Sequence, residues 1–281
     1  MGRTLIVNAD DLGLHEDIDQ GIEAAHRDGI VTSASIAAVG VSFDAAAELC
    51  RRCPELDVGV HLTLVGERPL TDPAGLGALV AKDGRFVEGH AALVARAVTA
   101  RLDSRAVRRE LEAQIQKVQR AGIRPSHLDG HQHVHLLPGI WAVVLELARA
   151  HGIRWVRVPA FRPLAANGSG PLRVGLRLGL NVLQRMRRAN LGELRSADVT
   201  PALGESGHLD AERIERALRT VPAGSVAELV VHPGVTTAAL EERYDWGYDW
   251  SGETAALTDE RLRRSVAAAG FELRRFADLA A

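Results

Sequence analysis

Four apolar runs of this chain end in acidic residues or histidines, and this pattern restricts the fold more than any other feature. The runs are short and rich in β-branched residues, and helical patterns separate them, which favours parallel strands with crossover helices. The polar ends are Asp10 and Asp11, His61, the stretch from His127 to His135, and His232. In a β/α barrel the carboxyl ends of the strands gather at one face. We therefore predict a single site built from four separate segments.

The same pattern predicts the fold class. We expect an α/β protein, a single distorted (β/α) barrel of about six or seven parallel strands, in preference to an open sheet. All 281 residues are expected to form one catalytic domain, with excursions at about 66–89 and 160–225. The predicted strands are 4–8, 33–39, 57–63, the first part of the histidine stretch, 155–158, 226–231 and 271–275. The predicted helices are 17–28, 43–52, 104–122, 138–151 and 258–269.

Composition and charge exclude several functional classes. The formal net charge is only -2, which gives no reason to expect nucleic acid or an anionic membrane as a partner. No apolar run approaches the ~20 residues that cross a bilayer, and the first residues do not resemble a signal peptide. We therefore expect a cytoplasmic protein without an integral membrane segment. The apolar and arginine-rich stretch 171–188 is interpreted as an amphipathic helix with a solvated basic face or a homodimer contact, rather than a membrane-surface helix.

The only two cysteines, Cys50 and Cys53, form a C-x-x-C pair. Such a pair can be a redox dithiol, but this one lies at the end of a helical stretch and not between a strand and the start of a helix. We interpret the two residues as reduced thiols.

Asp10 and Asp11 are adjacent, so in a regular strand they would point to opposite faces. A turn toward Gly13 would let both carboxylates reach one cavity. Two close carboxylates cannot both ionise freely unless a cation lies beside them. One carboxylate bound to a metal and the other acting as base satisfies this condition. A helix N-cap explains one of the two aspartates but not both.

The segment His127-Leu128-Asp129-Gly130-His131-Gln132-His133-Val134-His135 holds four of the 11 histidines. Imidazole and carboxylate are ligands that divalent metals select. Fully extended, the segment would span roughly 26 Å, whereas metal–nitrogen bonds are about 2 Å long. We therefore expect one or two ligands from its first half. The remaining residues, with Asp129, His131 and His133 as candidates, would line the substrate site or orient the ligands, and His135 has no assigned role.

Three further residues are candidates for the site. His61 ends a predicted strand, where it can be a ligand or a hydrogen-bonded core residue. His232 precedes Pro233 and can act as a general acid, or it can be a neutral histidine held extended by the proline. Arg157 can anchor a polar substrate or form a structural ion pair with a site carboxylate.

Several segments, in order along the chain, resemble the YdjC-like carbohydrate deacetylases, a family that includes chito-oligosaccharide and hopanoid-biosynthesis deacetylases. The resemblance covers residues 4 to about 234, but not 168–225. In two places the chain departs from the family pattern: Leu12 replaces an expected aromatic residue, and Gly130-His131-Gln132 is less rich in histidine. The matching segments are Leu5-Ile6-Val7-Asn8-Ala9-Asp10-Asp11-Leu12-Gly13, Gly29-Ile30-Val31-Thr32-Ser33, Gly59-Val60-His61, Ser126-His127-Leu128-Asp129 through His135, and Val231-His232-Pro233.

The resemblance implies a β/α barrel with one divalent metal ion, Mg²⁺ or Zn²⁺. By position, Asp11, His61 and His127 correspond to the metal ligands and Asp10 to the catalytic base. His232 takes the place of a strand-end His-Pro, consistent with an acid or a transition-state stabiliser.

Together these features predict a metal-dependent hydrolase that removes the N-acetyl group from an amino sugar, on an oligosaccharide or a glycolipid. A metal-dependent phosphoester hydrolase is the alternative enzyme class, although no Lys or Gly-rich phosphate cradle accompanies the histidines. A non-catalytic metal- or sugar-binding protein is the third possibility, and it would not require Asp10 as a base.

Overall fold

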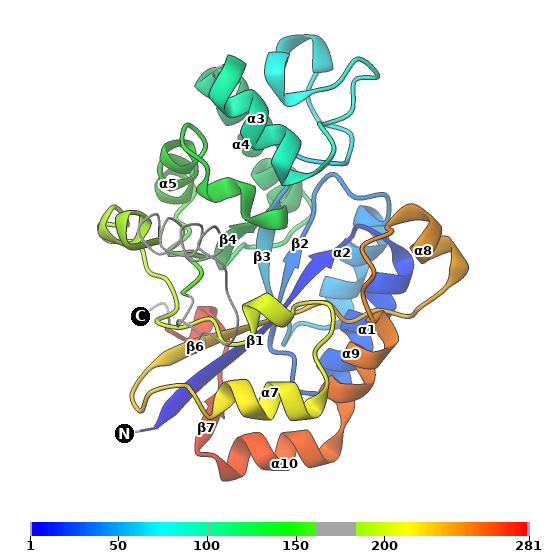
Figure 1. Cartoon of the computed structure of the whole chain (residues 1–281), viewed down its shortest axis with the longest axis vertical. Helices are drawn as coiled ribbons and strands as arrows, with labels where there is room; N and C mark the ends of the chain where they lie inside the picture. The colour runs from blue at the N-terminus through cyan, green and yellow to red at the C-terminus, as the bar shows by residue number, and fades with distance from the viewer. Residues whose placement is uncertain (1, 101, 161–183, 280–281) are drawn as a thin grey trace, which may run out of the picture.

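The computed structural model describes residues 2–100, 102–160 and 184–279. Parallel strands form its centre (Figure 1), in the order β5-β4-β3-β2-β1-β6, and β7 pairs with the first residues of β1. The strands are β1 (Arg3–Leu12), β2 (Ser33–Ile36), β3 (Asp57–Leu62), β4 (His127–Gly130), β5 (Trp155–Val156), β6 (Val226–Val231) and β7 (Phe271–Leu273).

The sheet is curled, and its two outer strands are joined through the segment 195–199. Arg195 forms a parallel bridge with Trp155 of β5, and Val199 forms one with Ala227 of β6. With these two single-residue bridges the sheet forms a curled, partly closed barrel. The predicted α/β fold with a distorted barrel of parallel strands is therefore confirmed.

Helices surround the strands (Figure 1). Neighbouring helices pack in a series around the barrel, α4 on α5, α2 on α1, α1 on α9, α9 on α10, and α10 on α7. The bounds are α1 (Glu16–Arg27), α2 (Phe43–Arg52), α3 (Gly89–Ala100), α4 (Ser104–Arg120), α5 (Trp141–Ala150), α7 (Ala211–Leu218), α8 (Ala238–Arg243), α9 (Trp250–Thr258) and α10 (Glu260–Ala268).

Alternation along the strands sorts apolar from polar side chains. Leu5, Val7 and Ala9 of β1 belong to the main apolar core beneath the helices. The intervening Asn8 and Asp10 point to the other side and hydrogen-bond to each other. The other strands follow the same rule, so the barrel interior holds buried polar residues beside a small apolar cluster of Ile6, Trp155 and Phe276. Its polar residues include Asn8, Asp10, Ser35, His61, His127, Asp129, Arg157 and Glu228.

Element boundaries differ modestly from the predicted ones. The strand expected over 33–39 ends at Ile36, and the helix expected over 258–269 is α10, which starts after α9 ends at Thr258. Most of the predicted amphipathic stretch 171–188 lies outside the described residues. Within the described ranges, none of the helices has both the length and the apolar character required to cross a bilayer.

Candidate active site

The strand register brings the predicted site residues to one end of the barrel. Ala9 of β1 pairs with Val231 of β6, so Asp10 and His232 follow at the same level. His61 of β3 pairs directly with Asp129 of β4. This agrees with the expectation that ligands collect at the carboxyl ends of parallel strands.

A local distortion of β1 lets two adjacent aspartates face the same interior. The register of β1 shifts between Ala9 and Leu12, and Asp11 has a φ of 71°. Positive φ is uncommon outside glycine, although aspartate tolerates it better than most residues. The strand thus continues to Leu12 through a bulge, beyond the end predicted at residue 8. Asp19 of α1 fixes the following turn by accepting the Gly13 N–H at 2.6 Å.

Replacing Asp19 by Asn is expected to stabilise the protein above about pH 6 and to change little near pH 4. Burial raises the pKa of Asp19 to about 6, although the hydrogen bond from the Gly13 N–H opposes the shift. Stability from an acid with a raised folded pKa is complete below the unfolded pKa and is lost as the pH rises through the folded one. Asn keeps the oxygen for Gly13 without the charge.

The expected gain at pH 8 is roughly 1–3 kcal/mol, at about 1.4 kcal/mol per pKa unit. Urea unfolding of wild type and Asp19→Asn at both pH values measures it. A variant no more stable than wild type at pH 8 contradicts the prediction.

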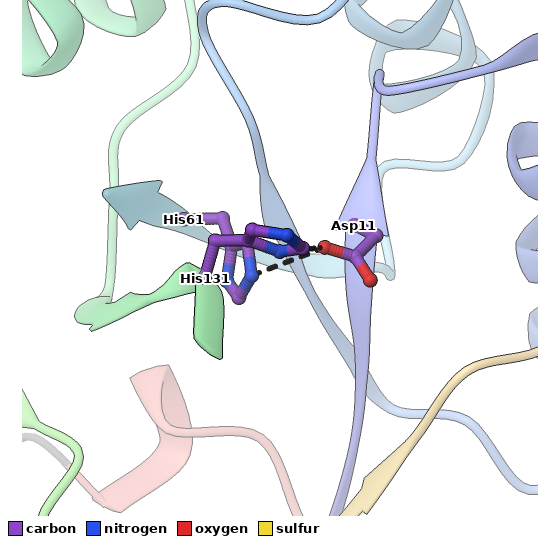
Figure 2. Close-up of side chains that lie close together, drawn as sticks. All are labelled: Asp11, His61 and His131. Atoms are coloured by element: carbon purple, nitrogen blue, oxygen red, sulfur yellow. Dashed lines mark hydrogen bonds and ion pairs between the residues drawn. The ribbon is translucent and has the colours of Figure 1, made fainter. Parts of the chain in front are cut away.

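Three side chains from three segments converge on one oxygen (Figure 2). Oδ1 of Asp11 lies 2.8 Å from Nδ1 of His131 and 3.2 Å from Nε2 of His61. All three residues are buried, and their ligand atoms lie within 4.8 Å of one another. We call Asp11, His61 and His131 the three-ligand group. A second set of close ligand atoms comes from Asp10, His61 and Asp129.

The proton positions on His61 make this group suitable for a cation. Nδ1 of His61 lies 2.8 Å from Oδ1 of Asp129, and a carboxylate can only accept, so Nδ1 carries a proton. In a neutral imidazole, Nε2 then presents its lone pair to the Asp11 carboxylate. This contact is favourable only with a cation between the two atoms or a second proton on the ring. Burial opposes the charged ring, but the surrounding aspartates hold the pKa of His61 well above its usual value.

Arg157, placed just after β5, links three buried carboxylates. Its Nη1 and Nη2 donate to both oxygens of Asp10 at 2.6 and 2.8 Å. Nη2 also lies 2.7 Å from Asp129, and Nε donates to Glu228 at 2.6 Å. We call Arg157, Asp10, Asp129 and Glu228 the Arg157 cluster. The bidentate geometry fixes the orientation of Asp10 beside the three-ligand group.

The cluster sets the charge of its carboxylates. Burial alone would raise the pKa of Asp10, but the Arg157 guanidinium outweighs it and holds the pKa below the usual value. The same guanidinium and His61 also lower the pKa of Asp129, although burial opposes this shift. Glu228 differs because burial dominates there and raises its pKa to about 7. Asp10 is therefore fully ionised at neutral pH, whereas Glu228 is close to its titration midpoint.

His127 lies one hydrogen bond away from the three-ligand group. Ser35 Oγ donates to Asp129 at 2.6 Å, so its lone pairs must accept the His127 Nε2–H at 3.0 Å. The His127 ring stacks at 4.1 Å on Phe276, and a Cβ on Gly59 would meet it at 2.4 Å. Nε2 of His127 thus faces Ser35 and not Asp11, and the three-ligand group does not include it, so the geometry favours His131 over His127 as a ligand. The assignment of His127 from the family pattern stays a prediction.

The remaining cluster histidines lie in a tight turn after β4. Residues His131–Leu136 form a 3₁₀ segment in which Gln132 and His133 have positive φ. Nε2 of His135 lies 2.9 Å from the Arg157 carbonyl and must donate to it, which supports the backbone of Arg157. Burial lowers the pKa of His133 to about 3 and that of His135 to about 4, so both rings are neutral at pH 7.

His232 lies at the end of β6 beside an aromatic side chain. Its backbone N–H donates to Glu253 at 2.6 Å, and its ring centroid is 5.1 Å from that of Tyr248. Within the described part of the chain, its buried Nδ1 has no hydrogen-bond partner.

Two parts of this region are not among the residues predicted from the sequence. Glu228 is the only charged residue in the apolar strand Val226–Val231, which could have marked it as a buried partner for an arginine. The segment 244–250 contains both tyrosines and two of the four tryptophans, and it lies next to His131 and His232. This local concentration of aromatic residues was the signal available in the sequence.

Comparison with known proteins places these features in a family. The model of the YdjC-like protein family matches residues 4–268. A human protein named carbohydrate deacetylase is 33% identical, with 98% of this chain and 90% of that protein aligned. A chitooligosaccharide deacetylase of Citrobacter koseri is 32% identical across 99% of this chain and its own full length.

A solved structure shares the whole architecture. The crystal structure of an Enterococcus faecalis V583 protein, described as a candidate cellobiose-phosphate cleavage protein, superposes with a TM-score of 0.82. Its sequence is 26% identical, and the alignment covers 100% of both chains. With the family match over nearly the full length, this chain belongs to the YdjC-like protein family.

Proposed function

We propose that this protein is a metal-dependent carbohydrate deacetylase that hydrolyses the N-acetyl group of an amino sugar, releasing acetate and a free amine. The observation that carries the proposal is the buried three-ligand group, with Asp10 held beside it by Arg157. The relatives named carbohydrate deacetylase and chitooligosaccharide deacetylase support the substrate class.

The donor set suits a divalent ion such as Zn²⁺ or Mg²⁺. One carboxylate and two imidazoles are a ligand set of catalytic zinc sites, which keep a further position open. The contact between His61 Nε2 and Asp11 Oδ1 also calls for positive charge at that point. Asp11, His61 and His131 would hold the ion, and Asp129 would orient His61 through Nδ1. When bound, such an ion polarises the acetamide carbonyl and lowers the pKa of a water.

Asp10 would act as the base for the attacking water. Its lowered pKa keeps it ionised at neutral pH, and Arg157 and Asn8 fix its oxygens in place. A carboxylate that is already ionised and oriented needs no reorganisation before it accepts a proton. Arg157 therefore has a positioning role in this mechanism.

His232 would protonate the departing nitrogen. An amine leaves poorly without a proton, so a donor is required near the scissile bond. His232 lies level with Asp10 on the neighbouring strand, and the hydrogen bond from its backbone to Glu253 fixes its position. Base and acid would thus come from two adjacent strands, β1 and β6.

Acetate release from N-acetylated sugars tests the proposal. Protein stripped with a chelator should be inactive, and protein reconstituted with Zn²⁺ or Mg²⁺ should release acetate from N,N′-diacetylchitobiose, longer N-acetylated chito-oligosaccharides or an N-acetylglucosaminyl lipid. Asp10→Asn should lower kcat by at least about 10²-fold, because general-base catalysis contributes at least that much. It should keep its metal.

Two results would count against this assignment. Metal-loaded protein that releases phosphate from phosphoesters and no acetate from any of these sugars would identify the alternative enzyme class. Asp10→Asn that loses metal to the same extent as Asp11→Ala would show that Asp10 is a ligand and not a separate base.

A further inference from the structure

An aromatic segment, residues 244–250, lies along the candidate site. It reads Tyr-Asp-Trp-Gly-Tyr-Asp-Trp, so an aromatic residue occurs at every second position. The rings of successive aromatic residues lie together, with centroids 4.6, 5.6 and 5.1 Å apart. The acidic and glycine residues between them are exposed, whereas the aromatic residues are buried or partly buried.

The two ends of the segment are anchored in the protein. Tyr244 is buried, and its hydroxyl lies 2.7 Å from Glu67 Oε1 in the excursion after β3. Trp250 is 1% exposed and starts α9. The backbone N–H of Asp249 donates to the Gly207 carbonyl at 2.7 Å. The segment is therefore a fixed part of the site wall.

The two middle aromatic residues face the candidate catalytic groups. The Trp246 ring lies 5.1 Å from the His131 ring, and the Tyr248 ring lies 5.1 Å from the His232 ring. Both remain partly exposed, unlike Tyr244 and Trp250. Together they extend from the three-ligand group to the proposed acid.

Tyr248 also presents an unused polar group. Within the described ranges, its hydroxyl makes no hydrogen bond to the protein. Burial, followed by the charges of Asp11, Glu253 and Asp10, raises the pKa of this phenol, so it stays protonated and can donate. A Cβ on Gly207 would lie 2.2 Å from the Tyr248 ring, so only glycine there allows the ring to take this position.

We propose that Trp246 and Tyr248 form the sugar subsite of this protein, in which a pyranose ring packs against Trp246 and the Tyr248 hydroxyl donates to a polar atom of the same substrate. This inference rests on the proposed function for its substrate class. The C–H bonds on one face of a pyranose carry partial positive charge, and aromatic faces are negative, so the two attract. A few polar groups among aromatic side chains are typical of small-molecule sites.

Binding of tri-N-acetylchitotriose tests the subsite directly. Metal-loaded Asp10→Asn protein binds the sugar without consuming it, and calorimetry compares it with the same protein carrying Trp246→Ala. We expect Kd to rise roughly tenfold or more with Trp246→Ala, and less with Trp246→Phe, which keeps a ring. Tyr248→Phe should weaken binding while leaving the ring contacts intact.

Asp245→Ala is the matched control, because Asp245 is exposed in the same segment and alternates away from the aromatic side. It should bind like the parent protein. Metal content is measured for every variant, since Trp246 also touches His131. Loss of metal in Trp246→Ala together with loss of sugar binding would make Trp246 a support for His131 and would overturn the subsite. Unchanged Kd in both Trp246→Ala and Tyr248→Phe would also overturn it.

The outcome separates the subsite from the reaction. If the wild type releases acetate and the Kd for the sugar is unchanged in these variants, the deacetylase function is retained and the subsite is rejected. Wild type that releases no acetate, but binds the sugar in a way that depends on Trp246, would retain the subsite and reject the reaction.

Discussion

His131→Ala is expected to remove the bound divalent metal and at least about 99% of the acetate-releasing activity, whereas His127→Gln should keep the metal. The difference follows from the two nitrogens involved. His131 Nδ1 lies 2.8 Å from the Asp11 oxygen beside His61, while His127 Nε2 is directed at Ser35 Oγ and lies outside the three-ligand group. Elemental analysis after dialysis against a defined concentration of Zn²⁺ measures the effect.

Gln is preferred to Ala at position 127 because the buried ring packs between Phe276 and Gly59. Far-UV circular dichroism and a melting curve show whether each variant is folded. If folded His127→Gln loses its metal and His131→Ala keeps it, the ligands are Asp11, His61 and His127, as the family pattern implies. His61→Ala serves as the positive control, because both ligand sets include it.

The sequence predicted the fold and the convergence of the candidate side chains because strand ends in a β/α barrel lie together. Asp10, Asp11, His61 and His232 each follow an apolar run, and the parallel register aligns those runs. That argument needs only the approximate position of each strand, so errors in strand length do not affect it.

The choice among the clustered histidines could not be made from the sequence. It depends on the turn after Gly130, where positive φ at Gln132 and His133 folds the chain back within a few residues. An extended reading separates His127 and His135 by roughly 26 Å. In the folded turn, His131 reaches Asp11 and His135 reaches the backbone of Arg157.

The partners of Arg157 could not be predicted from the sequence either. The sequence left Arg157 between a substrate anchor and a structural ion pair, and its contacts come from three strands far apart in the chain. Glu228 belongs to this set, but a single charge inside an apolar strand does not identify its partner. Register and interior packing decide such pairs, and neither can be obtained from local patterns.

Arg157→Met is expected to destabilise the protein by about 3–5 kcal/mol, since breaking a buried ion pair leaves uncompensated charge. Asp10, Asp129 and Glu228 would lose their shared cation while each remains nearly inaccessible to solvent. Their folded pKa values should then rise. Stability from carboxylates with raised folded pKa is complete below the unfolded pKa and is lost as pH rises, so the variant should be weakest at alkaline pH.

Urea unfolding at about pH 6 and 8 measures the stability of Arg157→Met. Glu228→Gln, alone and combined with Arg157→Met, completes a double-mutant cycle. Glu228→Gln alone should have a small effect, because burial already raises the pKa of Glu228 to about 7. In the double variant it should recover part of the loss, since one of the three carboxylates no longer needs a counter-ion.

Additive effects in this cycle would mean that Glu228 and Arg157 act independently, which contacting residues of one network are not expected to do. The double variant could instead be less stable than the sum of the two single effects predicts. That result would show that Glu228 stabilises the barrel by packing and hydrogen bonding and not by pairing its charge with Arg157.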